Sequence, residues 1–508
     1  MSTSYSSTRA GYWVLATTIA GASMSFIDGS VVNIALPAIQ QNLDASVTDI
    51  QWIVGINALM IGALVLVGGA LGDRFGRRRI YAIGVALFGG GSVACGLVNS
   101  ADQMIWFRGL QGIGGALLVP GSLAIVSSYF ADENRGWAIG TWSGFTALTT
   151  ALGPVIAGWF IENLSWRWVF FINLPLMIIT LILLFRFVPE SYDEEAPDQL
   201  DWIGAGLATA GLGGIVFAFI EASSRGWGDW LVISAAVIGG LGVIAFVIAE
   251  GRVAHPMMPL TLFQSPTFSG ANLFTLLLYG ALGSTFFFLP LNLIQLQGYS
   301  AVAAGAAFLP AILLIFSFSG QSGRLADRFG TRPLMVMGGL LVSAGFALFA
   351  LQGVGGSYWT TFFWPIIVLG FGLALMVPPL TTAVMSAVDA RYSGIASAIN
   401  NAMARVAGLL AIAILGYVLL TIFNDNLDIM LAGTELPDGV LQILDEERAR
   451  MAAAEMPESI GDDLKRTLDN FIKTAFLIGY RRVMWINAAL AALASLVAWL
   501  SVEIDLID

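Results

Sequence analysis

Long apolar runs recur along almost the whole chain. A helix needs about 20 apolar residues to cross the hydrocarbon core of a bilayer. Runs of this kind occur near 12–36, 51–71, 80–99, 103–128, 137–160, 168–188, 202–222, 229–250, 268–290, 302–322, 334–352, 360–386, 394–422 and 483–501. The pattern predicts fourteen transmembrane helices. Because the number is even, it places both termini on the same side of the membrane.

The composition agrees with a lipid environment. Of the 508 residues, 57% are hydrophobic and only 11% are charged, whereas a soluble globular protein carries about 25% charged residues. We therefore expect an all-α membrane protein. The net charge of −11 comes largely from acidic stretches at 189–201, 445–463 and 503–508, a pattern typical of solvated loops rather than of a binding face.

Several chemistries are excluded by what the sequence lacks. Cys95 is the only cysteine and His255 the only histidine, so neither a disulfide framework nor a multi-histidine metal site can be built. The sequence has no G-x-x-x-x-G-K-[ST] loop for a nucleotide and no nucleophile–base constellation. We expect neither an enzyme nor a bound metal or cofactor.

Arginines indicate the orientation of the chain, because Lys and Arg gather in short cytoplasmic loops. With a cytoplasmic N-terminus, the short outer loops hold Arg167 and Arg225 only. The inner segments hold Arg9, Arg74, Arg77, Arg78, Arg79, Arg135, Arg186, Arg252, Arg324, Arg328, Arg332 and Arg391. Both termini are therefore expected in the cytoplasm and the long 423–482 segment outside. Within that segment, "DDLKRTLDNFIKTAFLI" can lie as an amphipathic helix at the membrane interface.

Two parts of the sequence repeat. "GALGDRFGRRRI" (69–80) and "GRLADRFGTRPL" (323–334) share seven of twelve positions at an offset of 254. A second similarity links 117–140 with 374–397 at an offset near 258. We therefore expect a six-helix bundle over 1–190, an inserted helix pair over 191–266 and a second six-helix bundle over 267–508. Repeated bundles of this kind are typical of secondary transporters, whose substrate site lies near the midplane.

The first of these motifs resembles the loop motif of the major facilitator superfamily. "SFIDGSVVNIALPAI", "RGLQGIGGA", "GFTALTTALGPVIAGWF" and "SWRWVFFINLPL" resemble the fourteen-span drug:proton antiporters of that superfamily. The resemblance implies two six-helix bundles with two extra central helices. It also implies proton-driven export of amphipathic or drug-like compounds across the cytoplasmic (inner) membrane by alternating access. An exporter of an endogenous anionic or lipid-like metabolite is the alternative.

The expected partners follow from this function. They are a small-molecule substrate and the lipid bilayer, without nucleic acid, and the expected protein is a monomer with the proton gradient as its energy source. In similar transporters the loop aspartate, here Asp73, meets the start of the span that begins near Ser393–Gly394 and forms a conformational gate. The alternative is that the loop charges only fix the topology, which is our interpretation of Arg77 and Arg79. The gate residues are expected to be Gly69, Asp73, Arg74, Gly76, Arg78, Gly323, Asp327, Arg328, Gly330 and Arg332.

Charged residues inside the spans are costly and usually functional. Asp28 and Arg108 lie at similar depths in spans 1 and 4, so they can pair. We hypothesise that Asp28 binds the exported proton, or competes with a cationic substrate, and that Arg108 tunes the pKa of Asp28. A static structural ion pair is the alternative. Arg405 lies near the middle of span 13, and its partner is Asp28, backbone carbonyls or an anionic substrate; a structural role is equally compatible with the sequence.

The remaining candidates are polar, aromatic and small residues of the spans. With Arg405, the substrate-cavity candidates are Asn400, Asn401, Asn57, Phe26 and Tyr279. In span 5, small residues permit close helix packing and a proline bends the helix. The helix-packing motif of similar antiporters is carried here by Gly140, Gly144, Gly153, Pro154 and Gly158, and in those proteins the segment helps to seal the cavity.

Overall fold

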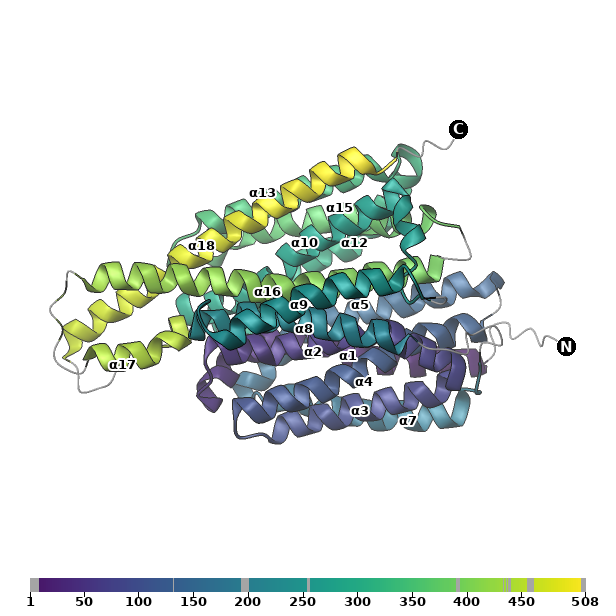
Figure 1. Cartoon of the computed structure of the whole chain (residues 1–508), viewed down its shortest axis with the longest axis horizontal. Helices are drawn as coiled ribbons and strands as arrows, with labels where there is room; N and C mark the ends of the chain where they lie inside the picture. The colour runs from purple at the N-terminus through teal and green to yellow at the C-terminus, as the bar shows by residue number, and fades with distance from the viewer. Residues whose placement is uncertain are drawn as a thin grey trace. The chain divides into compact units, whose positions relative to one another are not determined.

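The computed structural model describes residues 9–130, 132–192, 201–253, 256–389, 393–432, 434, 436, 440–454 and 461–503 (Figure 1). This described part is helical and contains no strand. Fourteen of its helices are long and apolar enough to cross a membrane. The all-α prediction and the number of spans are confirmed.

The helices follow the predicted runs closely. They are α1 (Arg9–Leu43), α2 (Val47–Phe75), α3 (Arg77–Leu97), α4 (Ala101–Tyr129), α5 (Asp132–Asn163), α6 (Trp168–Phe171), α7 (Asn173–Phe187), α8 (Trp202–Arg225), α9 (Trp230–Glu250), η1 (Leu260–Gln264), α10 (Pro266–Leu291), η2 (Asn292–Leu296), α11 (Ala301–Ala306), α12 (Leu309–Phe329), α13 (Thr331–Leu351), α14 (Tyr358–Thr361), α15 (Phe363–Ser386), α16 (Ser393–Leu431), α17 (Val440–Glu447), η4 (Arg448–Ala453) and α18 (Asp462–Ser501).

Local sequence sets several helix boundaries. The hydroxyl of Ser100 accepts a hydrogen bond from the Gln103 amide at the start of α4, and Ser265 does the same for Phe268 at the start of α10, as N-cap residues do. Gly76 and Gly330 separate α2 from α3 and α12 from α13, with φ of 108° and 80°. An L-residue with a side chain rarely adopts such angles, which explains why both copies of the repeated motif keep this glycine.

The chain divides by contact density into two compact units. One lies within Met1–Ala35, Trp52–Gly214 and Ile238–Pro259, and the other within Leu36–Gln51, Ile215–Val237 and Leu260–Asp508. The dividing points fall mostly inside helices rather than between them. The units therefore do not decide the expected bundle boundaries at 190 and 266, which stay predictions.

A close helix crossing occurs in each unit. A Cβ on Gly84 of α3 would lie 3.0 Å from the carbonyl oxygen of Gly114 in α4. In the second unit, a Cβ on Gly338 of α13 would lie 2.8 Å from the carbonyl oxygen of Gly372 in α15. Each pair of helices thus meets backbone to backbone, which only small residues allow.

The segment 423–482, expected to be mostly loop, is mostly helix in its described part. α16 continues to Leu431, and α18 begins at Asp462 and runs without a break into the last span. The predicted amphipathic helix is present as the first part of α18. Its apolar residues Leu468 and Phe476 are buried and α18 packs on α16, while its position at the membrane interface stays a prediction. In Figure 1 the two helices cross near the end where α17 lies.

Candidate functional site

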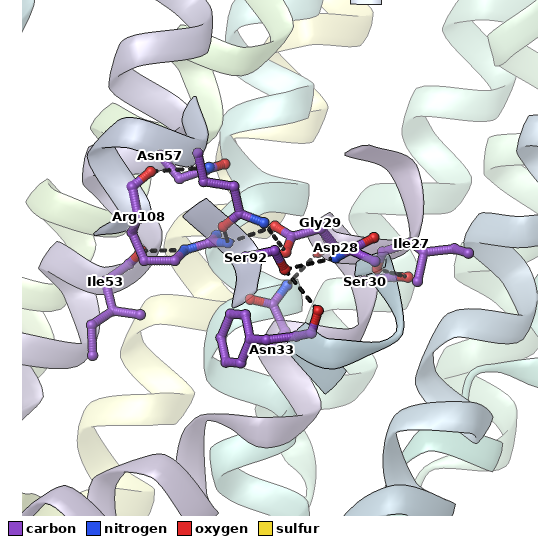
Figure 2. Close-up of polar contacts among 12 residues, drawn as sticks. Ile27, Asp28, Gly29, Ser30, Asn33, Ile53, Asn57, Ser92 and Arg108 are labelled. Atoms are coloured by element: carbon purple, nitrogen blue, oxygen red, sulfur yellow. Dashed lines mark hydrogen bonds and ion pairs between the residues drawn. The ribbon is translucent and has the colours of Figure 1, made fainter. Parts of the chain in front are cut away.

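A buried ion pair joins α1 and α4 in the first unit (Figure 2). Arg108 Nη1 donates to Asp28 Oδ2 at 2.6 Å and to Gln111 Oε1 at 2.5 Å. Gln111 Nε2 donates to Asp28 Oδ1 at 2.8 Å. Both oxygens of Asp28 are therefore occupied, and its side chain is only 2% exposed.

Further contacts orient Arg108 within this cluster. Its Nε donates to the Ile53 carbonyl at 3.0 Å, and Asn57 Nδ2 donates to the Arg108 carbonyl at 3.3 Å. The guanidinium also lies over the ring of Phe170, 6.0 Å from its centroid. Asn57, a cavity candidate, thus holds the backbone of α4 beside the charged pair.

The structure brings together Asp28 and Arg108, as their depths had indicated, and adds Gln111. Gln111 was not among the residues predicted from the sequence, although a signal was present. Residues three apart on a helix share a face, so Gln111 had to lie beside Arg108. A buried amide that both donates and accepts is well suited to bridge an ion pair.

Small residues of α5 pack against α1 close to the pair. A Cβ on Gly153 would lie 3.1 Å from Ser30 Cβ and 3.4 Å from Val31 Cγ1. Pro154 lies within the helix beside it, and Gly158 is buried. At Gly140 and Gly144, no described atom lies within 4 Å of the corresponding Cβ position. Among the described neighbours, close packing therefore occurs at Gly153 and not at these two glycines.

The loop between α2 and α3 is a network of charges. Asp73 pairs with Arg77 at 2.8 Å, a residue that the sequence analysis had assigned to topology alone. Glu190, which follows α7, accepts from the Arg78 backbone amide at 2.8 Å and lies 3.6 Å from Arg79 Nε. A Cβ on Gly76 would lie 2.8 Å from a carboxylate oxygen of Glu190.

Glu190 was missed because an acid after a span resembles an ordinary loop residue. The arrangement shows that this loop is anchored to the end of α7. The expected contact between Asp73 and the start of α16 stays a prediction. Of the other gate residues, a Cβ on Gly69 would approach Pro120 at 3.7 Å, and Arg74 lies over the ring of Phe75 at 5.3 Å.

The second copy of the motif lies between α12 and α13 and is less connected. Arg328 lies over the ring of Phe329 at 5.2 Å, and Arg332 over Trp499 of α18 at 5.7 Å. A Cβ on Gly323 would meet no described atom within 4 Å. The side chain of Asp327 lies outside the described part of the chain. The two copies therefore share the glycine turn and differ in their described contacts.

Three of the substrate-cavity candidates line one pocket in the second unit. Tyr279, Asn400 and Asn401 surround a cavity of about 80 Å³ together with residues of α15. Asn400 Nδ2 donates to Thr275 Oγ1 at 2.7 Å and to Asn272 Oδ1 at 3.2 Å. Drug-sized ligands fill pockets of about 300–1,000 Å³, so this cavity accommodates one chemical group rather than a whole ligand.

The remaining candidates lie apart from that pocket. Arg405 follows the lining residue Ala404 on α16. Among the described residues of the second unit, the side chain of Arg405 has neither an ion pair nor a hydrogen bond. Phe26 of α1 packs edge-on against Trp142 of α5, with centroids 6.0 Å apart, and contributes to the core of the first unit.

The sequence is similar to a known protein family along most of its length. Residues 18–412 match the model of the Major Facilitator Superfamily. The chain belongs to this superfamily. It is accordingly a multi-pass membrane transporter and not an enzyme.

Several curated relatives are named as resistance proteins. The chain is 31% identical over 482 residues to the "Tetracenomycin C resistance and export protein" of Streptomyces glaucescens, covering 94% of this chain and 89% of the relative. It is 35% identical to the "Puromycin resistance protein pur8" of Streptomyces alboniger, covering 80% and 81%. It is 33% identical to the "Multidrug resistance protein Stp" of Mycobacterium tuberculosis, covering 78% and 74%. The resemblance to drug exporters is confirmed.

Solved structures support the fold. A bacterial homolog of the human lysosomal transporter Spinster, in an inward-facing conformation, aligns with a TM-score of 0.66 at 16% identity, covering 98% of this chain and 100% of that one. The nucleoside transporter NupG aligns with a TM-score of 0.60 at 13% identity, covering 97% and 100%. At these identities the likeness establishes the fold alone.

Proposed function

We propose that this transporter is a proton-coupled antiporter that exports amphipathic, drug-like compounds by alternating access. It would lie in the cytoplasmic membrane with both termini inside. The observation that carries the proposal is the buried cluster of Asp28, Arg108 and Gln111 within the membrane-spanning part of the chain. Such a charge pair is costly in a membrane and is retained for a function.

The cluster offers a defined proton acceptor. A proton that binds Asp28 Oδ2 removes the negative charge and converts its strong ionic hydrogen bond with Arg108 into a weaker contact. Arg108 keeps its bonds to the Ile53 carbonyl and to Gln111, so the guanidinium stays in place while the contact between α1 and α4 loosens. Proton binding would thereby change how these two helices pack.

Two further observations support the direction of transport and the substrate class. The relatives are named for resistance to tetracenomycin C and puromycin and for multidrug resistance, and resistance of this kind follows from export. The twelve arginines of the inner segments against two in the short outer loops support cytoplasmic termini.

The test is dye export measured in inside-out vesicles. Collapse of the proton gradient should abolish export by the wild-type chain, and Asp28→Asn should abolish it with the gradient intact. Asp102→Asn, which changes an exposed carboxylate in the first turn of α4, is the matched control and should transport normally. Export by Asp28→Asn that still responds to the gradient would refute Asp28 as the coupling residue.

A second candidate function is favoured by Arg405. Asp28 is already bonded on both oxygens, and the second unit offers Arg405 no described ion pair. A half-buried cation within a span attracts an anionic group, which favours export of an anionic or lipid-like compound. Competition between matched organic anions and cations for export distinguishes the two functions. Arg405→Gln should weaken inhibition by the anions and leave inhibition by the cations unchanged.

A further inference from the structure

The inserted helix pair carries two buried carboxyl groups that belong to no site described so far. Asp201 precedes α8, and Glu250 is the last residue of α9. Their residues are 9% and 2% exposed. All the contacts of this cluster lie within the first unit.

One oxygen of each carboxyl group has a clear structural role. Asp201 Oδ1 accepts from the Gly204 amide at 2.7 Å and so caps the start of α8. Glu250 Oε2 accepts from the Met258 amide at 2.9 Å. Through this bond, Glu250 holds the segment that leads from α9 toward η1.

The other two oxygens have no such partner. Asp201 Oδ2 and Glu250 Oε1 are buried and receive no hydrogen bond from a described donor. Both approach the same place, because they lie 2.5 Å and 2.8 Å from where a Cβ on Gly204 would be. The absence of a side chain at Gly204 is what lets the two carboxyl groups meet.

Two ionised carboxylates can only accept hydrogen bonds, and placing them together without a donor costs free energy. A shared proton removes both problems, since it neutralises one group and supplies the missing donor, as in paired carboxyl groups about 3 Å apart. We propose that Asp201 and Glu250 hold one proton between them. This proton clasps the start of α8 to the end of α9.

A metal ion fits this place less well. Calcium and magnesium take six or more oxygen ligands, and the described residues contain no group of three acidic, histidine or cysteine side chains placed to hold a metal ion. Of the described titratable groups, Asp201 is the one that acts electrostatically on Glu250. Arg252, two residues further on, is exposed, and His255 lies outside the described residues.

The clasp makes the inserted pair sensitive to pH. Loss of the shared proton leaves two adjacent negative charges, which repel each other. The repulsion pushes the end of α9, with the Met258 amide still bonded to Glu250, away from the start of α8. The described backbone that follows α9, at 251–253 and 256–259, should therefore loosen as pH rises. This second protonation site is independent of Asp28 and of the proposed transport function.

Infrared spectroscopy of the purified full-length protein in nanodiscs tests the shared proton directly. At about pH 7, where an ordinary carboxyl is ionised, the wild-type spectrum should contain the carbonyl stretch of a protonated carboxyl group. Asp201→Asn and Glu250→Gln should each remove the intensity of one group. Asp229→Asn is the matched control, because this residue caps α9 at its other end through Leu231, and it should change nothing. Equal intensity in the wild type and both single variants would overturn the proposal, as would a band that disappears on adding sodium, potassium or magnesium salts.

Hydrogen exchange provides the second measurement. After correction for intrinsic exchange, protection of 251–259 in the wild type should fall about tenfold per pH unit above the midpoint of the transition, as expected for the loss of one proton. In Asp201→Asn the amide donates in place of the proton, so protection should be independent of pH between about 6 and about 9. The same decline in that variant and in the wild type would also contradict the clasp.

Discussion

Neutralising Asp28 should destabilise the protein mainly through the charge that it leaves behind. Both side chains of the pair are nearly inaccessible, at 2% exposed for Asp28 and 3% for Arg108. Removing one partner of a buried ion pair typically costs about 3–5 kcal/mol, because the other charge stays buried without compensation. Asp28→Asn creates this situation for Arg108.

The remaining contacts place the expected cost at the lower end of that range. Arg108 keeps the Ile53 carbonyl at 3.0 Å and Gln111 Oε1 at 2.5 Å, and the amide oxygen of the introduced asparagine can still accept a neutral hydrogen bond. We therefore expect a loss of about 3 kcal/mol in the free energy of unfolding. The double variant Asp28→Asn with Arg108→Gln removes both charges, so its stability should return to within about 1 kcal/mol of the wild type.

The assay is reversible unfolding of the full-length protein in mixed micelles, with Asp102→Asn as the control. The coupling between the two substitutions should be about 2 kcal/mol or more and favourable. Neither the single nor the double variant should transport, because both lack the proton acceptor. If the double variant were as unstable as the sum of the single variants, the buried charge would not be the source of the loss.

Three further outcomes follow from the packing of glycines. Gly84→Ala should lower the free energy of unfolding by about 1–3 kcal/mol, because the added methyl group separates α3 from α4. Gly90→Ala on the same helix should not lower it, since no described atom lies within 4 Å of the added Cβ. Equal thermal stability of the two variants would contradict the crossing. Gly153→Val should reduce both folding yield and transport through contact with α1, and Gly140→Val should leave both unchanged; a normal Gly153→Val protein would argue against close packing there. Gly76→Ala should lower the free energy of unfolding by about 1–3 kcal/mol, because a φ of 108° with a ψ of 122° is a backbone conformation that residues with a side chain rarely adopt. Displacement of Glu190 should add to this loss. Thermal unfolding measures it, and an unchanged melting temperature would show that the turn is adaptable.

Much of the architecture was predictable because it depends on a single length scale. Each apolar run has to match the thickness of a bilayer, so fourteen runs gave fourteen helices. The same length scale explains why 423–482 was predicted to be a loop although its described part is mostly helix. A helix that continues beyond the apolar layer, as α16 does to Leu431 and α18 does from Asp462, becomes amphipathic there, and hydropathy no longer distinguishes it from a surface segment.

Residues of the candidate site could be predicted where their burial in a membrane is energetically unfavourable. Asp28 and Arg108 were identified because a charge within a span requires a reason. Gln111 and Glu190 were not, because an uncharged amide in a span and an acid after a span are both common. Arg77 was interpreted as a topological charge, but it pairs with Asp73. Which residue a side chain pairs with depends on the direction in which the side chain points. The spacing of residues along one helix does not determine that direction relative to a neighbouring helix.

The two backbone-to-backbone crossings bear on how the halves of the chain have diverged. Gly84 and Gly338 are 254 positions apart, and Gly114 and Gly372 are 258 apart, which are the offsets of the two sequence repeats. The second copy has therefore kept the same crossing, with a glycine on each helix. A duplicated segment can exchange its lipid-facing residues freely, but one added carbon at either glycine would force a helix pair apart. At these four positions, the sequence repeat and the close packing of the helices both require a glycine.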